Sequence, residues 1–140
     1  MRVLRSKKVM MLLTVLIVGG ATAAVAIPAV VSQQVINDNT SVRFRVVRTV
    51  ADGFDSGWHV HPGIAVVQVQ EGSFQIYQGS CTPKTVGAGE TYIEVPHLAV
   101  RAVATGRIAW TTTLITNGGD LPQIPLAAYS PDRPNPCPGT

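Results

Sequence analysis

The sequence contains few of the residues on which most enzyme chemistry depends. Its 140 residues include two cysteines and three histidines, and only 14% are Asp, Glu, Lys or Arg. It has no glycine-rich phosphate loop, no carboxylate pair at a catalytic spacing, and no Ser or Cys with a partner base. The sequence therefore gives no sign of a phosphate-binding or nucleophilic enzyme, and we assign no catalytic residue from it.

Basic residues are also scarce outside the N-terminus. The formal net charge of the whole chain is +3, but residues 27–140 carry seven Lys and Arg against eight Asp and Glu. Nucleic-acid binding needs a basic stripe, and these scattered charges form none. We therefore expect no nucleic-acid partner.

Residues 1–26 have the layout of a secretory signal peptide. A basic start precedes the apolar run 9–18, and small residues follow up to Ala26, which is the pattern of a cleaved leader. The alternative is an uncleaved anchor helix, because residues 9–31 carry no charge and are numerous enough to span a bilayer. Both alternatives predict an extracytoplasmic protein, secreted or attached to the membrane through this segment only.

The two cysteines, Cys81 and Cys137, predict a disulfide. An exported protein meets an oxidising compartment, where an even number of cysteines is usually paired. A bond between them would close a long loop and stabilise the fold by roughly 3 to 4 kcal/mol. The alternative, two reactive or metal-binding thiols, is not supported by a pair motif.

Residues 41–116 have the pattern of an all-β domain. Runs rich in Val, Ile, Thr and aromatic residues alternate with glycine-marked turns, and none has helical periodicity. Many short strands without helices predict a closed or double-sheet antiparallel architecture. In the first run Arg43 and Arg45 alternate with apolar residues, which predicts that both arginines face solvent. The expected strands are 41–50, 64–71, 74–77, 91–95, 98–105 and 107–116.

Three further segments surround these strands. We expect 27–40 to be a linker and 51–57 to be a turn-rich loop. Residues 117–140 hold six of the ten prolines, so we expect them neither to join a sheet nor to form a helix. This tail would wrap the domain surface as far as Cys137, or would act as a free recognition segment.

Two of the three histidines, His59 and His61, lie in the stretch 57–63. In an extended strand this spacing directs both imidazoles to the same face, where the two can coordinate one metal ion. The small apolar residues that follow at odd-numbered positions point to the same face of the strand as the histidines. This shared face predicts an apolar pocket that contains the two imidazoles. These residues are Ala65, Val67 and Val69.

The spacing around the histidine pair resembles the first motif of the cupin superfamily. That motif has the form Gly, five residues, His-x-His, three or four residues, Glu, six residues, Gly. The matching positions in this chain are Gly53, His59, His61, Ala65 and Gly72. The resemblance implies a small antiparallel β-barrel of the jelly-roll type, in which many members bind a divalent metal through three His and one Glu.

Only half of that ligand set is matched, so the motif is degenerate. The stretch 89–96 resembles the start of the second cupin motif, in which a Gly-led strand ends at Pro and a His follows. Ala65 stands in place of the Glu, and the third His falls near Arg101, which has no lone pair to offer. His97, directly after this stretch, is the remaining candidate for a third ligand.

Three hypotheses for the pocket stay open. In the first, His59, His61 and His97 hold one divalent transition metal, such as Zn, Fe, Mn, Ni or Cu. In the second, the pair is a buried and hydrogen-bonded remnant without a metal. In the third, Arg101 binds a small anionic ligand beside the pair, and the pocket is lined by Trp58, Tyr77, Tyr92 and Trp110.

The leading prediction is an exported, single-domain cupin-like module that binds a small molecule or a metal. The alternatives are a metal-dependent cupin enzyme of the oxygenase or isomerase type, and a structural or partner-binding envelope protein that uses tail 117–140 as its contact. Each is compatible with a homodimer. We expect the side chains of Glu71, Glu90 and Glu94 to be solvated.

Overall fold

Strands make up most of the computed structural model, which describes residues 28–38 and 42–139. The predicted leader, 1–26, lies outside the described residues. Among the residues described, no helix is long and apolar enough to cross a membrane. The elements are β1 (Ala29–Asp38), β2 (Arg43–Asp55), β3 (His59–Val60), β4 (Ile64–Glu71), β5 (Ser73–Gln78), β6 (Lys84–Gly87), β7 (Thr91–Glu94), β8 (Val100–Thr116), β9 (Ile124–Pro125) and the short helix α1 (Leu126–Tyr129).

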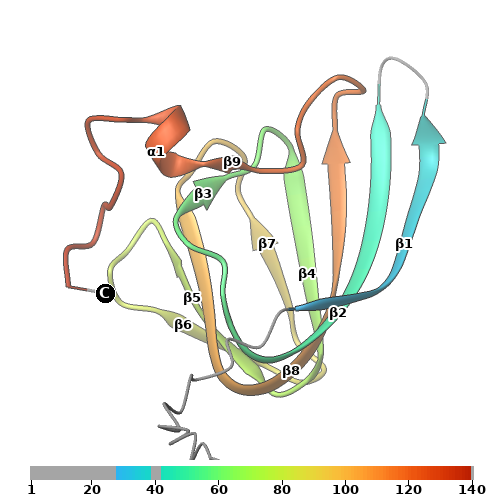
Figure 1. Cartoon of the computed structure of the whole chain (residues 1–140), viewed down its shortest axis with the longest axis horizontal. Coiled ribbons are helices and arrows are strands. Elements are labelled where there is room, and N and C mark those ends of the chain that lie inside the picture. The colour runs from blue at the N-terminus through green and yellow to red at the C-terminus, as the bar shows by residue number, and fades with distance from the viewer. Residues whose placement is uncertain (1–27, 39–41, 140) are drawn as a thin grey trace, which may run out of the picture.

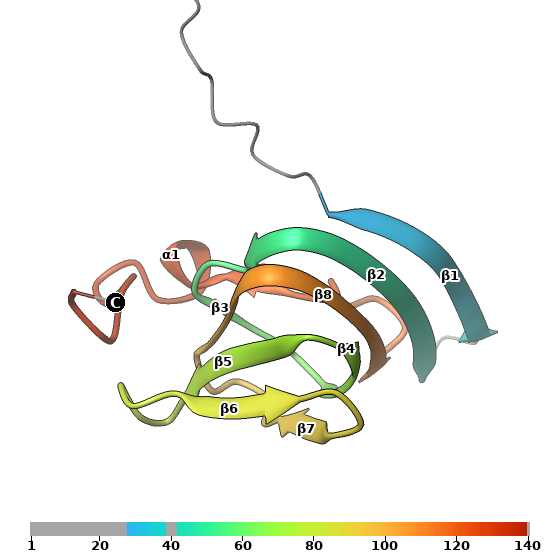
Figure 2. The same ribbon diagram turned by 90° about the horizontal axis from the view of Figure 1, so that it is seen from below.

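The long strand β8 holds the barrel together. Strand β2 pairs with most of its length, from Val103 to Thr116, β4 pairs with its C-terminal half, and β5 and β3 pair with its N-terminal half. Outside these, β1 pairs with β2, β7 with β4, and β6 with β5, all antiparallel. Seen from below, β1, β2 and β8 curve over a second layer formed by β4 to β7 (Figure 2). The predicted antiparallel all-β architecture is therefore confirmed.

The core lies between the two layers. Its largest fully buried side chains include Phe74, Ile76 and Ile108. Phe74 also packs against Trp110 and Phe54, with ring centroids 5.1 and 5.8 Å away. The predicted inward parity of Ala65, Val67 and Val69 is confirmed, because all three are buried.

Four of the expected segments differ from the elements in the structure. Most of the expected linker 27–40 is strand β1, because its backbone pairs with β2 despite a polar composition that disfavours strands. The expected loop 51–57 mostly continues β2, where Gly53, with φ at +76°, accommodates a register shift. The expected strands 98–105 and 107–116 form the single strand β8, which runs through Gly106.

The tail 117–140 also departs from the prediction that it forms neither strand nor helix. It contributes β9, which pairs with β3, and the single turn α1. The strand is only two residues long, and its proline lies at a sheet edge, where a missing N–H is tolerated. The tail crosses the top of the barrel in Figure 1. The predicted Cys81–Cys137 disulfide is confirmed, and it leaves no free cysteine.

Candidate metal site and cavity

The histidine pair sits where β3 meets both β8 and the tail. His59 pairs with Val100 of β8 on one side and with Pro125 of β9 on the other. Both imidazoles are buried, each residue being 4% exposed. Their Nε2 atoms lie 3.1 Å apart, so the predicted convergence of the two side chains on one point is confirmed.

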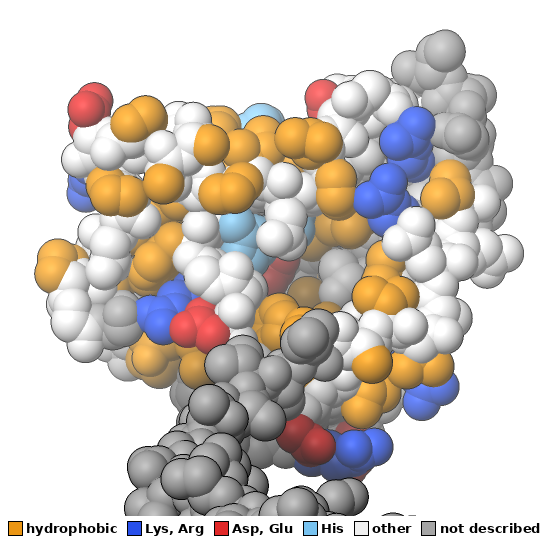
Figure 3. Space-filling view, in the orientation of Figure 1, with side chains coloured by type: hydrophobic (Ala, Val, Ile, Leu, Met, Phe, Trp, Pro, Cys, Tyr) orange, Lys and Arg blue, Asp and Glu red, His pale blue; other side chains and the backbone are white. Residues whose placement is uncertain are grey.

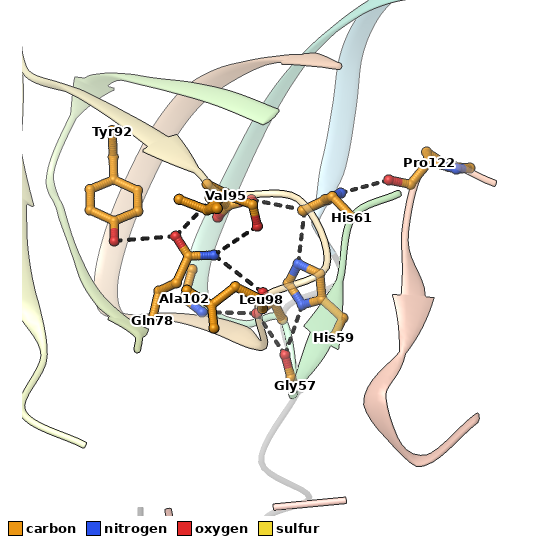
Figure 4. A network of polar contacts seen from close by, with 11 residues as sticks. Gly57, His59, His61, Gln78, Tyr92, Val95, Leu98, Ala102 and Pro122 are labelled. Carbon is orange, nitrogen blue, oxygen red and sulfur yellow. Dashed lines mark hydrogen bonds and ion pairs between the residues drawn. The ribbon is translucent and has the colours of Figure 1, made fainter. Parts of the chain in front are cut away.

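Two backbone carbonyls fix the orientation of the rings (Figure 4). His59 Nδ1 lies 3.0 Å from the Gly57 oxygen, and His61 Nδ1 lies 2.6 Å from the Pro122 oxygen. A carbonyl only accepts hydrogen bonds, so each Nδ1 carries the proton and donates it. In the neutral rings the lone pairs are therefore on the two Nε2 atoms, which is the arrangement typical of metal-ligating histidines.

Glu94 completes a group of three ligand atoms. Its Oε2 lies 2.8 Å from His61 Nε2, and the residue is only 3% exposed. His59, His61 and Glu94 offer one ligand atom each, all within 4.8 Å of one another. The expectation that Glu94 is solvated is therefore wrong. Exposed and buried residues alternate along β7, which turns Glu94 inward, but the neighbouring Ile93 is exposed, so the sequence has no apolar alternation that could have identified Glu94.

Burial and hydrogen bonding set the proton affinities of the two rings. Burial lowers the pKa of His59, and the Gly57 carbonyl offsets only part of this effect. Burial also acts to lower the pKa of His61, but the hydrogen bond and charge of Glu94, with the Pro122 carbonyl, raise this pKa above the usual value. Without a metal, His61 therefore holds a second proton more strongly than His59 does.

A cavity of about 350 Å³ opens beside the three ligand residues. Figure 3 shows histidine side chains at the bottom of a depression in this face of the molecule. The cavity is lined by His59, His61 and Glu94 at one side, and apolar and aromatic side chains form most of the remaining wall. These include Phe54, Val67, Phe74, Trp110 and Leu114.

Arg101 does not line this cavity, so the predicted anion pocket does not form around it. Its neighbour Ala102 faces the cavity, and the alternation of β8 directs Arg101 to the other face. There it makes two hydrogen bonds to Asp55, of 2.9 and 2.6 Å. The guanidinium is thus already paired with a carboxylate of the protein itself.

His97 also stays apart from the pair. Its backbone N–H donates to the His61 carbonyl, at 2.9 Å, but its imidazole is exposed and stacks on Tyr129, with 6.2 Å between ring centroids. A φ of +60° marks the tight turn that directs the ring outward. Among the described residues the candidate metal group takes Glu94 as its third member and does not include His97.

Three of the four aromatic residues predicted to line the pocket lie elsewhere. Trp58 packs edge-to-face on Tyr77 and borders a separate cavity of about 210 Å³ next to the disulfide. Tyr92 packs against the core, and its hydroxyl donates to Gln78 (Figure 4). The fourth, Trp110, does line the main cavity, together with Phe54 and Phe74.

Comparison with known proteins shows the fold. No protein family model and no curated sequence matches the chain. An uncharacterised protein with a double-stranded β-helix domain from Klebsiella pneumoniae is 21% identical, with a TM-score of 0.52 over 71% of this chain and 79% of that one. A protein of unknown function from Streptococcus pyogenes is 17% identical, with a TM-score of 0.50 over 61% of this chain and 73% of the other. The chain therefore has a double-stranded β-helix fold, in agreement with the antiparallel β-barrel that its first motif implied.

Proposed function

We propose that this protein is an exported cupin-type module in which His59, His61 and Glu94 bind one divalent transition metal. The observation that carries the proposal is the convergence of three buried ligand atoms on one point, with both histidine tautomers fixed by carbonyls. Glu94 takes the place that the sequence assigned to His97.

The donor set fits a metal in its chemistry and its spacing. Two imidazoles and a carboxylate suit Zn, Fe, Mn, Ni and Cu, the metals expected from the sequence. Ligand atoms bound at about 2.0 to 2.2 Å lie roughly 3 Å apart in neighbouring positions, and the two short separations here are 2.8 and 3.1 Å. A cation would replace the proton that His61 and Glu94 share, because metal ligands bind in their deprotonated form.

A second candidate function is catalysis by the same site. The observation that favours it is the cavity beside the ligand residues, because three protein ligands leave positions for water or a substrate. A bound metal would supply a Lewis acid there. The chain itself contributes orientation of the ligands and an apolar wall that limits water at the site.

Metal analysis of three matched proteins tests the proposal. The full chain should be expressed with export, purified, stripped with a chelator and titrated with Zn²⁺ and Mn²⁺ by calorimetry. We expect one metal per wild-type chain and at least a tenfold weaker affinity in Glu94→Gln, since loss of even an outer-shell partner costs about 10- to 100-fold. Glu71→Gln, which changes an exposed carboxylate, is the control and should bind as the wild type does. A wild-type protein that binds neither metal would overturn the proposal.

Export has its own test. The leader pattern and the Cys81–Cys137 disulfide support an oxidising compartment as the location of the folded domain. Cell fractionation should recover the protein outside the cytoplasm. N-terminal sequencing of that fraction should begin at Ile27 if the leader is cleaved, and at Met1 if it is an anchor. Recovery in the cytoplasm with reduced cysteines would contradict export.

A further inference from the structure

Arg45 lines the cavity and is only partly exposed. The prediction of a solvated arginine was wrong, because the inward set of β2 contains Arg45, Val47 and Thr49, all of which line the cavity. The Nε of Arg45 is buried and has no hydrogen-bond partner among the described residues. The residue as a whole is partly exposed, but a buried N–H donor without a partner is costly, so this position needs a reason beyond packing.

The strand register places Arg45 opposite the candidate metal group. Directly opposed residues in antiparallel strands share one face of the sheet, and four of them form a continuous row from β2 through β8 and β4 to β7. Arg45 and Glu94 are its two ends, separated by three strand spacings, or roughly 14 Å along the curved sheet. The row is Arg45, Leu114, Ala65 and Glu94.

Most side chains next to this row are apolar. In the neighbouring row Val47 and Val67 flank Thr112, and Phe74 and Trp110 line the same cavity. The only acidic side chain that lines the cavity among the described residues is Glu94, and its carboxylate already contacts His61. The cavity therefore joins an apolar body, the three ligand residues and one positive charge that has no carboxylate partner in the part of the chain that the structure describes.

We propose that this cavity binds a small monocarboxylate, with the carboxylate on Arg45 and the apolar part against Trp110 and Phe74. A guanidinium matches the planar carboxylate by two parallel hydrogen bonds. The volume of about 350 Å³ is at the small end of ligand pockets, which favours a compact acid. The inference rests on the proposed function in one respect: the bound acid would lie beside the metal held by His59, His61 and Glu94.

Calorimetric binding of three acids and their neutral amides tests this inference. The probes are benzoate, 3-phenylpropanoate and 4-methylpentanoate, each against its amide, with the full-length protein in metal-loaded and chelator-treated forms. We expect at least one acid to bind the wild type roughly 10- to 100-fold more tightly than its amide, the range for charge-assisted hydrogen bonds. Arg45→Gln should lose this preference. Arg48→Gln, which alters an exposed arginine of the same strand, should keep it.

The two proposals fail in different ways. If no acid is preferred over its amide, or if Arg45→Gln keeps the preference, the carboxylate inference is overturned whatever the metal content. If the preference depends on Arg45 but the wild type binds no metal, the carboxylate inference stands and the metal proposal falls. Arg45→Gln should keep the metal affinity of the wild type, which also shows that the variant is folded.

Discussion

Ala65 and Glu94 are direct cross-strand partners in the pairing of β4 with β7. The cupin motif that this sequence resembles has its glutamate at position 65. In this chain the carboxylate beside the histidine pair belongs to Glu94, the residue opposite position 65. Ala65 is fully buried, and its small side chain leaves space for the carboxylate of Glu94. The carboxylate that the motif places on one strand is thus found on the neighbouring strand.

This pairing predicts that a carboxylate at position 65 can replace the carboxylate of Glu94. Glu94→Ala should abolish metal binding, and adding Ala65→Glu should restore most of it, because opposed Cβ atoms are only about 4.5 to 5.5 Å apart. Metal titration of the single and double variants measures the recovery, with circular dichroism as the check on folding. A double variant that binds no better than Glu94→Ala would show that the two positions are not equivalent.

The parts of the site that follow from local spacing were predictable. The His-x-His pair directs both imidazoles to one face, and the cupin-like spacing from Gly53 to Gly72 implied the fold. Glu94 was not predictable in the same way, because its place depends on the register between β4 and β7. That register is set by tertiary pairing, which single-strand patterns do not contain.

Errors of parity explain the other differences. Arg45 lies on the opposite strand face from the one predicted, and Arg101 lies on the face that rules out the anion-pocket hypothesis, because a shift of one residue exchanges the two faces of any strand. Apolar residues on both faces of β2 made the alternation ambiguous: Phe44 and Val46 are partly buried, as is Val47 on the other face. The expected linker 27–40 was misjudged because the pairing of β1 with β2 outweighs its polar composition.

Gly72 should be intolerant of any side chain. It has a φ of +76°, and a Cβ at this position would lie 2.2 Å from the Arg107 oxygen. Gly89 has a similar φ of +85° but no atom within 4 Å of its Cβ position. Gly89→Ala should therefore lower the free energy of unfolding by about 1 to 2 kcal/mol, and Gly72→Ala by a further 1 to 3 kcal/mol, roughly the cost of overpacking. Urea denaturation compares them, and equal losses would contradict the close contact.

The disulfide should contribute through the long loop that it closes. Cys81 and Cys137 are 56 residues apart, so replacing both with Ser should lower the free energy of unfolding by roughly 3 to 4 kcal/mol. Chemical denaturation of the double variant measures this loss. The wild type should fall to the same stability in a reducing buffer, which is the control, whereas an unchanged denaturation midpoint would contradict the prediction.

The ion pair between Asp55 and Arg101 should give stability that depends on pH. The hydrogen bonds from Arg101 hold the pKa of Asp55 below its usual value. A carboxylate with a lowered pKa contributes stability that is fully present above its unfolded pKa, about 3.9, and is lost as the pH falls through the folded pKa. The Asp55 side chain is 47% exposed, so solvent screening limits this contribution to about 1 kcal/mol or less.

Arg101→Gln isolates this contribution. Urea denaturation between pH 3 and 7 should show a constant difference in stability between wild type and variant above about pH 5. Toward pH 3 the difference should shrink as Asp55 becomes protonated in the wild type. The carboxylate partners of Arg107 are more exposed than Asp55. The stability difference between wild type and Arg107→Gln should therefore change less over the same pH range. A difference between wild type and Arg101→Gln that stays constant down to pH 3 would mean that Arg101 stabilises the barrel by packing of its aliphatic stem and not through the charge of Asp55.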